Sequence, residues 1–405
     1  MAVLSLIRLF TTLLSLAILA AAGYFLWSWY SGDLVRDAAG ELQRQRDDWR
    51  LWLGLGLAAW SLLGRFVVLA LFARPDRRPT GPRRGEGELV QSPTGSSLYV
   101  ETHGPVGGAP VIFTHGWGMD STFWRYARED LDQRFRLILW DLPGLGKSKP
   151  AGPDAISLEA FATDLAGLVE LAGQQRPVLV GHSIGGMTIQ TLLRDHPHLR
   201  RRLAGVVLLN TTYTNPLNTM VLARMLRALQ RPLLEPASYL TILLQPLVWL
   251  SKWQSYLSGS AHLAHRAGFG HFVTRSQLEH ATLLATRNPP AVQARGDLAM
   301  FHWDATGALR DAQVPALVIG GEADIVTKPE ASRVIADEAS QGKLHIVPQV
   351  NHMGPLERYD VYDQLIADFV LEQQPVASGD LRPDASPLGS TPYASDERSD
   401  RPPPR

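Results

Sequence analysis

The chain contains no cysteine among its 405 residues, and this absence removes several kinds of chemistry. Disulfide bonds, a thiolate nucleophile and metal sites built on cysteine are all excluded, whereas the redox compartment stays undetermined. An excess of charge of one sign is also missing, because 39 lysines and arginines balance 39 aspartates and glutamates. Nothing therefore favours a polyanionic partner, and we expect no binding to nucleic acid.

Two long apolar runs near the N-terminus predict membrane-spanning helices at about residues 9–30 and 51–73, within a membrane anchor of residues 1–75. Each run is long enough to cross the ~30 Å hydrocarbon core of a bilayer. Arg65 interrupts the second run, close enough to its end for the side chain to reach water. A cleaved signal peptide is the alternative, with small residues at Ala20–Gly23 as its cleavage site, but the first run is too long for one.

The arginines around these runs predict an orientation in the membrane. Five arginines follow the second run within residues 74–84, against four in the polar loop 31–50. The positive-inside rule then places the N-terminus and the rest of the chain in the cytoplasm, beneath a membrane of the bacterial inner-membrane type. If the second run instead lies in the interface, the rest of the chain faces the other side. Residues 76–87, rich in proline, glycine and arginine, are expected to form a linker.

A serine between two glycines stands at the junction of an apolar strand and a helical pattern. Gly181, Ser183 and Gly185 form the pattern G-x-S-x-G. Such a tight strand-to-helix turn forces the serine into strained backbone geometry and leaves no room for side chains at its neighbours. The helix that follows directs free N–H groups to the same point. The pattern predicts that Ser183 is a nucleophile, the alternative being an incidental serine in a glycine-rich turn.

Strands and helices alternate around this turn, which predicts a parallel sheet covered by helices. After a hairpin within residues 89–102, the predicted strands lie at 111–114, 135–140, 178–180, 205–209, 316–320 and 344–347, with helices at 157–172 and 329–339. The alternation stops at residues 211–312, where apolar helices broken by prolines predict a cap over the site. We expect the whole domain to cover residues 88–374, and the tail 375–405 to be disordered.

Two polar residues follow later strands, where a serine nucleophile would find its partners. Asp324 comes after strand 316–320, and His352 comes after strand 344–347. A serine hydroxyl needs a base, and the base needs a carboxylate that orients it. The simpler interpretations are a turn carboxylate and a surface histidine. The rival residues lie before or within the strands: they are Asp297, Asp304, Asp311 and His345.

Five motifs make the chain resemble the α/β-hydrolase superfamily, because they occur in the order typical of it. They are His115-Gly116-Trp117-Gly118, Asp141-Leu142-Pro143-Gly144-Leu145-Gly146-Lys147-Ser148, Gly181-His182-Ser183-Ile184-Gly185, Gly321-Glu322-Ala323-Asp324 and Asn351-His352. The resemblance covers roughly residues 89–372 and looks like the serine hydrolases with a helical cap, such as membrane-anchored monoacylglycerol lipases and related esterases. Epoxide hydrolases and haloalkane dehalogenases share the His-Gly-Trp loop, but their nucleophile is an aspartate.

This resemblance implies an α/β-hydrolase fold, with a mostly parallel sheet and a helical cap, preceded here by the transmembrane hairpin. It implies a catalytic triad in the chain order nucleophile, acid, base: Ser183, Asp324 and His352. The backbone N–H groups of Trp117 and Ile184 are expected to form the oxyanion hole, which leaves the Trp117 side chain free to line the acyl pocket. The residues next to Trp117 and Ser183 in the sequence are expected to pack or hydrogen-bond behind the site without transferring protons. They are His115, Gly116 and His182.

Two further patterns suggest binding sites that we reject. Gly146-Lys147-Ser148 resembles the end of a phosphate-binding loop, but Asp141 occupies the position where that motif needs a glycine. This segment is instead expected to be a turn beside the active site. A second pattern consists of histidines that could hold a metal, but no carboxylate completes it at ligand spacing. These histidines are His262, His265 and His271.

The sequence thus predicts a membrane-anchored serine hydrolase that cleaves carboxylic esters, of lipid type, through an acyl-enzyme. It needs no cofactor and no metal, and its partners are the ester substrate and the lipid bilayer. One alternative keeps the triad for other chemistry, as in cofactor-free haloperoxidases, perhydrolases and C–C bond hydrolases. A second alternative is a non-catalytic binding protein of the same fold, against which the complete triad argues.

Overall fold

The structure, a computed structural model, describes residues 2–374, with the side chains described from residue 10 onward. The tail for which disorder was predicted, residues 375–405, lies outside the described residues.

The centre of the fold is an eight-stranded sheet with the strand order β10-β9-β8-β7-β5-β6-β4-β3. β4 pairs antiparallel with β3 and β6, and the other neighbours are parallel. The strands span Gly87–Gln91 (β3), Ser97–His103 (β4), Ala109–Thr114 (β5), Phe135–Trp140 (β6), Val178–His182 (β7), Gly205–Leu209 (β8), Ala316–Gly321 (β9) and Gly342–Val347 (β10). The predicted hairpin and mostly parallel sheet are confirmed.

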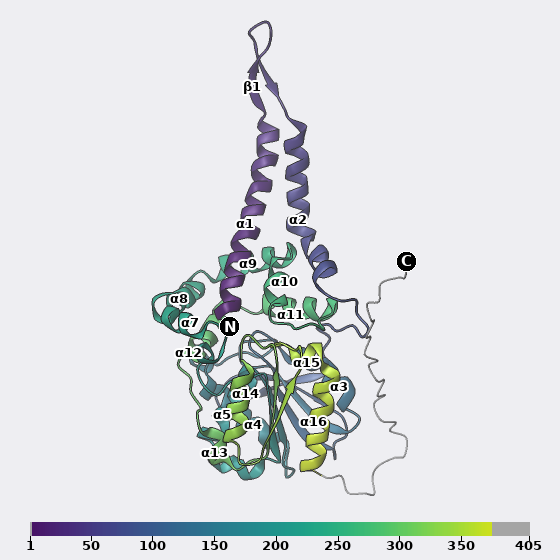
Figure 1. The fold of residues 1–405 in the computed structure, drawn as a ribbon, viewed down its shortest axis with the longest axis vertical. Helices are drawn as coiled ribbons and strands as arrows, with labels where there is room; N and C mark the ends of the chain where they lie inside the picture. The colour runs from purple at the N-terminus through teal and green to yellow at the C-terminus, as the bar shows by residue number, and fades with distance from the viewer. Residues whose placement is uncertain (1, 375–405) are drawn as a thin grey trace, which may run out of the picture. The chain divides into compact units, whose positions relative to one another are not determined.

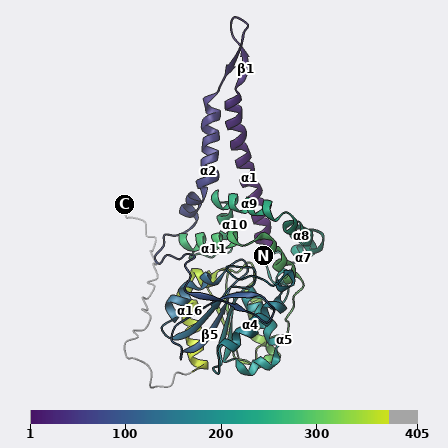
Figure 2. The ribbon, with the colours of Figure 1, turned by 180° about the vertical axis from the view of Figure 1, so that it is seen from behind.

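Helices cover both faces of this sheet (Figures 1 and 2). Alternate residues of a buried strand point to opposite faces, so Val206 and Leu208 pack on one side and Val207 and Leu209 on the other. The first side holds α4 (Leu158–Leu171), α5 (Ile184–Asp195), α13 (Ala308–Ala312) and α14 (Pro329–Glu338). The second side holds α3 (Arg125–Leu131), α15 (Gly354–Glu357) and α16 (Tyr359–Gln373). Short 3-10 turns lie at Ser121–Trp124 (η1), Pro153–Ala155 (η2) and Pro197–Arg202 (η3).

The residues between β8 and β9 form the predicted helical cap. Its helices are α6 (Pro216–Thr219), α7 (Ala223–Leu229), the π-helical turn η4 (Gln230–Leu234), α8 (Glu235–Leu243), α9 (Gln245–Leu257), α10 (Ser260–Arg266), α11 (Arg275–Arg287) and α12 (Pro290–Phe301). Pro216, Pro236 and Pro246 lie in the first turns of helices, where a missing N–H costs nothing. They therefore begin helices and do not break them. The range predicted for the cap also included α13, which packs on the sheet.

Two long helices precede the sheet. They are α1 (Ala2–Ser31) and α2 (Asp48–Phe72), and the segments Phe10–Ser31 and Asp48–Phe72 are each long and apolar enough to cross a membrane. The connection between them was predicted as a loop, but it forms an antiparallel ribbon of β1 (Asp33–Arg36) and β2 (Leu42–Gln45). Asp37 stabilises its turn, because the carboxylate accepts hydrogen bonds from the amides of Ala39 and Glu41.

The hairpin of α1 and α2 contacts the cap through small residues. The Ser15 hydroxyl lies 2.6 Å from that of Ser258, at the C-terminal end of α9. On α2, a side chain at Gly64 would place its Cβ 2.4 Å from the Ser258 carbonyl oxygen. The absence of a side chain at Gly64 thus lets the backbones of α2 and the cap approach closely. Arg65 extends its guanidinium over the ring of Tyr256 on α9, 4.9 Å from the ring centre.

Residues 76–87 connect α2 to β3, but they bind along the domain and do not form a free linker. Arg78 pairs with Asp130 at 2.7 Å and with Glu129 at 2.8 Å. Arg84, which is largely buried, pairs with Asp120 at 2.6 Å and with Asp141 at 2.8 Å. The proline, glycine and arginine composition indicated a lack of regular structure correctly, but it did not reveal that the arginines have partners on the domain.

Candidate active site

Ser183 lies at the turn between β7 and α5 with a backbone φ of 53° and ψ of −117°. This positive φ is costly for a residue with a side chain, and the predicted strain is therefore observed. A Cβ at Gly181 would lie 2.5 Å from the backbone of Gly185, and one at Gly185 would lie 2.3 Å from the Thr114 carbonyl oxygen. Both neighbours of the turn must be glycine, as the sequence pattern predicted.

His352 and Asp324 lie beside Ser183, as the sequence predicted. The distance from His352 Nε2 to Ser183 Oγ is 3.0 Å, and that from His352 Nδ1 to Asp324 Oδ2 is also 3.0 Å. All three residues are buried. A carboxylate can only accept, so Nδ1 carries the imidazole proton and donates a hydrogen bond to Asp324. The lone pair of Nε2 is then left to accept a hydrogen bond from the serine hydroxyl.

Asp324 is held as a carboxylate by its surroundings. Burial alone would raise the pKa of Asp324, but the charge and hydrogen bond of His352 and the amide of Asn210 outweigh it, so this pKa lies below its ordinary value. The Asp324 Oδ1 atom accepts from the backbone N–H groups of Val326 and Thr327, each at 2.8 Å. These bonds fix the direction of the carboxylate toward the imidazole.

Asn210 is a site residue that the sequence reasoning missed. It follows β8 with a φ of 43°, and its Nδ2 donates to Asp324 Oδ2 at 3.0 Å and to the Asn351 carbonyl at 3.1 Å. Its Oδ1 accepts from the Tyr362 hydroxyl at 2.7 Å. One signal was available: Asn210 is a polar residue directly after a buried strand, at the same edge of the sheet as Ser183.

The oxyanion-hole candidates lie on two segments that meet at the serine. Ile184 is the first residue of α5, so its N–H has no acceptor within the helix. Trp117 lies on the loop after β5, but its side chain is not free to line a pocket. Its Nε1 donates to the Gln293 carbonyl at 3.1 Å, and a Cβ at Gly296 would lie 2.0 Å from its ring. Trp117 therefore joins its loop to cap helix α12.

The remaining predicted residues lie behind the site. The His115 Nδ1 donates to the Gly116 carbonyl at 2.9 Å, and its Nε2 accepts from the Leu142 N–H at 3.0 Å. The His182 Nε2 donates to the His352 carbonyl at 2.9 Å. Burial, with the nearby His352, lowers the pKa of His182 to about 3, so this ring stays neutral. A Cβ at Gly116 would lie 2.5 Å from His182 Nδ1, so only glycine fits there.

The segment Gly146-Lys147-Ser148 is a turn fixed by Asp141. The Asp141 Oδ2 accepts from the Lys147 N–H at 2.8 Å, and Oδ1 accepts from the Ser121 N–H at 2.7 Å. Burial and the charge of Asp120 raise the pKa of Asp141, although Arg84 acts in the opposite direction. Asp141 thus joins this turn to the end of the Trp117 loop, and Arg84 bridges the carboxylates of Asp120 and Asp141.

The histidines that suggested a metal do not converge in the part of the chain that the structure describes. His262 is buried and its Nε2 lies 2.6 Å from Glu279 Oε2 on α11. His265 bonds to the Ala261 carbonyl, and His271 lies against Phe272. Within residues 2–374 no group of three histidines or carboxylates is placed to hold a metal ion.

The model of the α/β-hydrolase fold family matches residues 109–359, well over half of the chain. The chain belongs to this family.

Its relatives among the α/β hydrolases include a protein of Variovorax paradoxus named as a carbamate hydrolase, RutD, 25% identical over 279 residues, which are 67% of this chain and 96% of the relative. A pimeloyl-[acyl-carrier protein] methyl ester esterase of Nitrosospira multiformis is 27% identical over 288 residues, which are 68% and 97% of the two chains. A thermophilic esterase from Thermogutta terrifontis superposes with a TM-score of 0.53 and 25% identity, over 71% of this chain and 99% of the esterase.

Proposed function

We propose that this α/β hydrolase is a membrane-anchored serine hydrolase that cleaves carboxylic esters, of lipid type. The observation that carries the proposal is the chain of contacts Ser183–His352–Asp324, with 3.0 Å at each step. An incidental serine and a surface histidine would not be expected to form such a chain of buried hydrogen bonds. The division into a membrane anchor (1–75), a connector (76–87) and a hydrolase domain (88–374) belongs to the same proposal, with the cap formed by the helices from α6 to α12.

In the proposed mechanism Ser183 Oγ attacks the ester carbonyl while His352 Nε2 accepts its proton. Asp324 stabilises the imidazolium that forms, without taking the proton itself. The N–H groups of Trp117 and Ile184 donate to the oxyanion of the tetrahedral intermediate, a contribution typically worth about 3 kcal/mol for each donor. His352 then returns the proton to the leaving alcohol, and water enters to hydrolyse the acyl-enzyme by the same steps.

The similar proteins support cleavage of carboxylic esters. The relative from Nitrosospira multiformis is named as a pimeloyl-[acyl-carrier protein] methyl ester esterase, and the fold neighbour is named as an esterase. The proposed preference for lipid esters rests on the hairpin. The hairpin of α1 and α2, long and apolar enough to cross a membrane, would hold the enzyme where such esters are found. The proposed orientation keeps the hydrolase domain in the cytoplasm.

A fluorophosphonate probe tests the proposed nucleophile. We expect the full chain in liposomes to be labelled, with the label on Ser183 in peptide mapping, and the Ser183→Ala protein to stay unlabelled. Hydrolysis of an ester panel with increasing acyl length then tests the substrate class. A labelled Ser183→Ala protein would contradict the assignment, and strong labelling without turnover of any ester would favour other chemistry on the same triad.

Arg84 provides a prediction about how the Trp117 loop is positioned. Replacing Arg84 by methionine leaves Asp120 and Asp141 buried without their shared cation. The loop should then shift, and we expect kcat for ester hydrolysis to fall about 10- to 100-fold with KM changed less. The exposed neighbour Arg83, replaced by methionine in the same way, is the control and should keep the wild-type kcat. A lowered melting temperature with unchanged kcat would show that Arg84 contributes to the stability of the fold but does not position the Trp117 loop for catalysis.

The proposed topology predicts where reporters would lie. A reporter inserted at Gly40, at the tip of the ribbon between β1 and β2, should be translocated across the membrane. A reporter fused after residue 377 should stay in the cytoplasm. Alkaline phosphatase and green fluorescent protein fusions measure the two positions independently. A translocated C-terminal reporter would show that only one helix spans the membrane.

A further inference from the structure

One boundary of the proposed membrane region is marked by charges at the ribbon end of the hairpin. Arg50 forms an ion pair with Asp33 at 2.5 Å, and Trp29 donates to Asp48 at 3.4 Å. Charged groups of this kind do not lie in the hydrocarbon core, whereas tryptophan and tyrosine favour its edge. The core therefore begins near Tyr30 on α1 and near Trp49 on α2.

Along α1 and α2, the first contacts with the cap occur before the helices have crossed the full thickness of the hydrocarbon core. Fifteen residues separate Tyr30 from Ser15, and fifteen separate Trp49 from Gly64, the two positions at which the hairpin contacts Ser258. At ~1.5 Å per residue this distance is about 22 Å, which is roughly 8 Å less than the ~30 Å hydrocarbon core. Tilting the helices would shorten the span further. The lipid must therefore extend past the first contacts between the hairpin and the cap.

The cap surface at this level is apolar. Five large side chains of α8 and α9 are between 53% and 76% exposed: they are Tyr239, Leu240, Leu243, Leu247 and Leu250. The helical arms Ala223–Leu243 and Gln245–Leu257 meet at 98°, and together they are apolar enough for a broken span or a re-entrant loop. Trp249 does not belong to this surface, because its Nε1 donates to the Thr286 carbonyl inside the cap.

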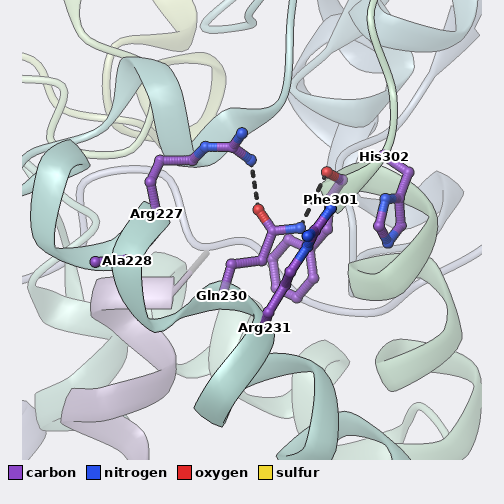
Figure 3. Close-up of a pocket in the computed structure, with 6 residues that line it drawn as sticks. All are labelled: Arg227, Ala228, Gln230, Arg231, Phe301 and His302. Carbon is purple, nitrogen blue, oxygen red and sulfur yellow. Dashed lines mark hydrogen bonds between the residues drawn. The ribbon is translucent and has the colours of Figure 1, made fainter.

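Basic residues adjoin this apolar surface. Arg224, Arg227 and Arg231 are exposed on α7 and η4, three and four residues apart, and so lie on one side of the helix. Arg227 and Arg231 border a hollow of about 250 Å³ with His302 (Figure 3). In Figures 1 and 2, α7 lies level with the first turns of α1. At ~45 Å, α1 is long enough to reach the headgroups at both ends.

We infer that the outer surface of α8 and α9 is embedded in the lipid leaflet beside the hairpin, with the arginines of α7 at the level of the headgroups. The partner of this surface is the bilayer itself. The inference rests on the proposed membrane anchor and deepens the proposed function, because an ester with a long acyl chain then reaches Ser183 from the leaflet without crossing water.

Hydrogen bonds between hydroxyl groups join the hairpin to the cap. Thr12 bonds to the Ser255 hydroxyl at 3.2 Å, and Ser15 bonds to the Ser258 hydroxyl at 2.6 Å. Such partners are needed by polar groups away from water. Arg65 places its guanidinium over the rings of Phe66 and Tyr256, at 4.7 and 4.9 Å from their centres. The cation–π attraction is stronger where water is excluded, so these rings offset part of the cost of an arginine within the hydrocarbon core.

The test uses the absence of cysteine, which makes every introduced thiol unique. Single cysteines at Leu247, Leu19 and Val106 are labelled with a fluorophore in the full-length Ser183→Ala protein in phosphatidylcholine vesicles. Leu19 lies in the hairpin, and the exposed Val106 lies at the opposite end of β5 from the site. We expect brominated phosphatidylcholine to quench the label at Leu247 to at least half the extent seen at Leu19, and aqueous iodide to quench mainly the label at Val106.

Quenching of the Leu247 label by iodide to the extent seen at Val106 would overturn the inference. Protection of this label from both quenchers would also overturn it, and would indicate that a second copy of the chain covers the surface. Because these measurements use the Ser183→Ala protein, they stand whether or not the proposed hydrolysis is correct.

A kinetic arm uses the active enzyme. Replacing Leu243, Leu247 and Leu250 together by serine should lower kcat/KM for a long-chain ester in vesicles at least 10-fold, and for a short soluble ester less than about 3-fold. Val106→Ser is the matched control and should change neither value. Equal losses on both esters in the triple variant would contradict entry of the substrate from the leaflet.

Discussion

Replacing Ser183 or His352 by alanine is expected to lower kcat roughly 10^4- to 10^6-fold, and Asp324→Asn about 10^4-fold, while the protein stays folded. In the proposed mechanism the three side chains act in one proton transfer, and His352 contacts both Ser183 and Asp324 at 3.0 Å. A Ser183→Ala/His352→Ala double variant should therefore be little worse than either single variant. Initial rates on a soluble ester and thermal melting of each variant provide the measurement.

Two rival residues serve as matched controls for this prediction. His345 is exposed on β10, and Asp304 is exposed beside the cap, so neither faces the serine. His345→Ala and Asp304→Asn should keep kcat within about 3-fold of the wild-type value. Near-normal turnover in Asp324→Asn would show that another carboxylate orients the histidine. Additive losses in the double variant would mean that the residues do not act as a unit.

Gly185→Ala is expected to have the second-largest effect, although the change adds one methyl group. The new Cβ would lie 2.3 Å from the Thr114 carbonyl oxygen, and neither backbone segment can move without disturbing the sheet. We expect a loss of about 3 kcal/mol or more in the free energy of unfolding, and at least a 100-fold loss of kcat from displacement of Ser183. Chemical denaturation and ester kinetics measure the two losses.

Gly152→Ala is the matched control for this change. A Cβ at Gly152 would meet nothing within 4 Å, and its extended backbone is open to any residue. This variant should keep both stability and turnover. If Gly185→Ala had the same free energy of unfolding and the same kcat as Gly152→Ala, the turn that carries Ser183 would be less tightly packed than its geometry indicates.

The elements that the sequence predicted well are those fixed by burial on both faces or by a local clash. Strands β6 and β8 have the predicted bounds because parallel strands inside a fold are continuous apolar runs, which polar residues end sharply. The helix predicted at 157–172 is observed as α4, where the Ser157 hydroxyl caps the first turn by accepting from the Ala160 N–H. The turn at Ser183 was predictable because only glycine fits at Gly181 and Gly185.

The features that were missed depend on contacts between distant segments. The position of Asn210 after a buried strand indicates the edge of the sheet where it lies, but not that its side chain binds Asp324, 114 positions away. Arg84 lies in a segment with the composition of a linker. Its structural role depends on ion pairs with two carboxylates on other loops. The Trp117 ring was expected in the acyl pocket, but the Gln293 carbonyl draws it toward the cap. Composition and periodicity describe local structure, and they carry no record of which distant groups meet.

The contact between the hairpin and the cap sets an order of events during synthesis. α2 ends at Phe72, and α9, which it contacts, begins only at Gln245. At roughly 5–20 residues per second, a ribosome needs about 9–35 s to make the intervening chain. If α1 and α2 span the membrane as proposed, they can be inserted before their partner in the cap emerges. The cap would then assemble against helices already surrounded by lipid, and chains that fail to insert would lack the surface on which their cap is completed.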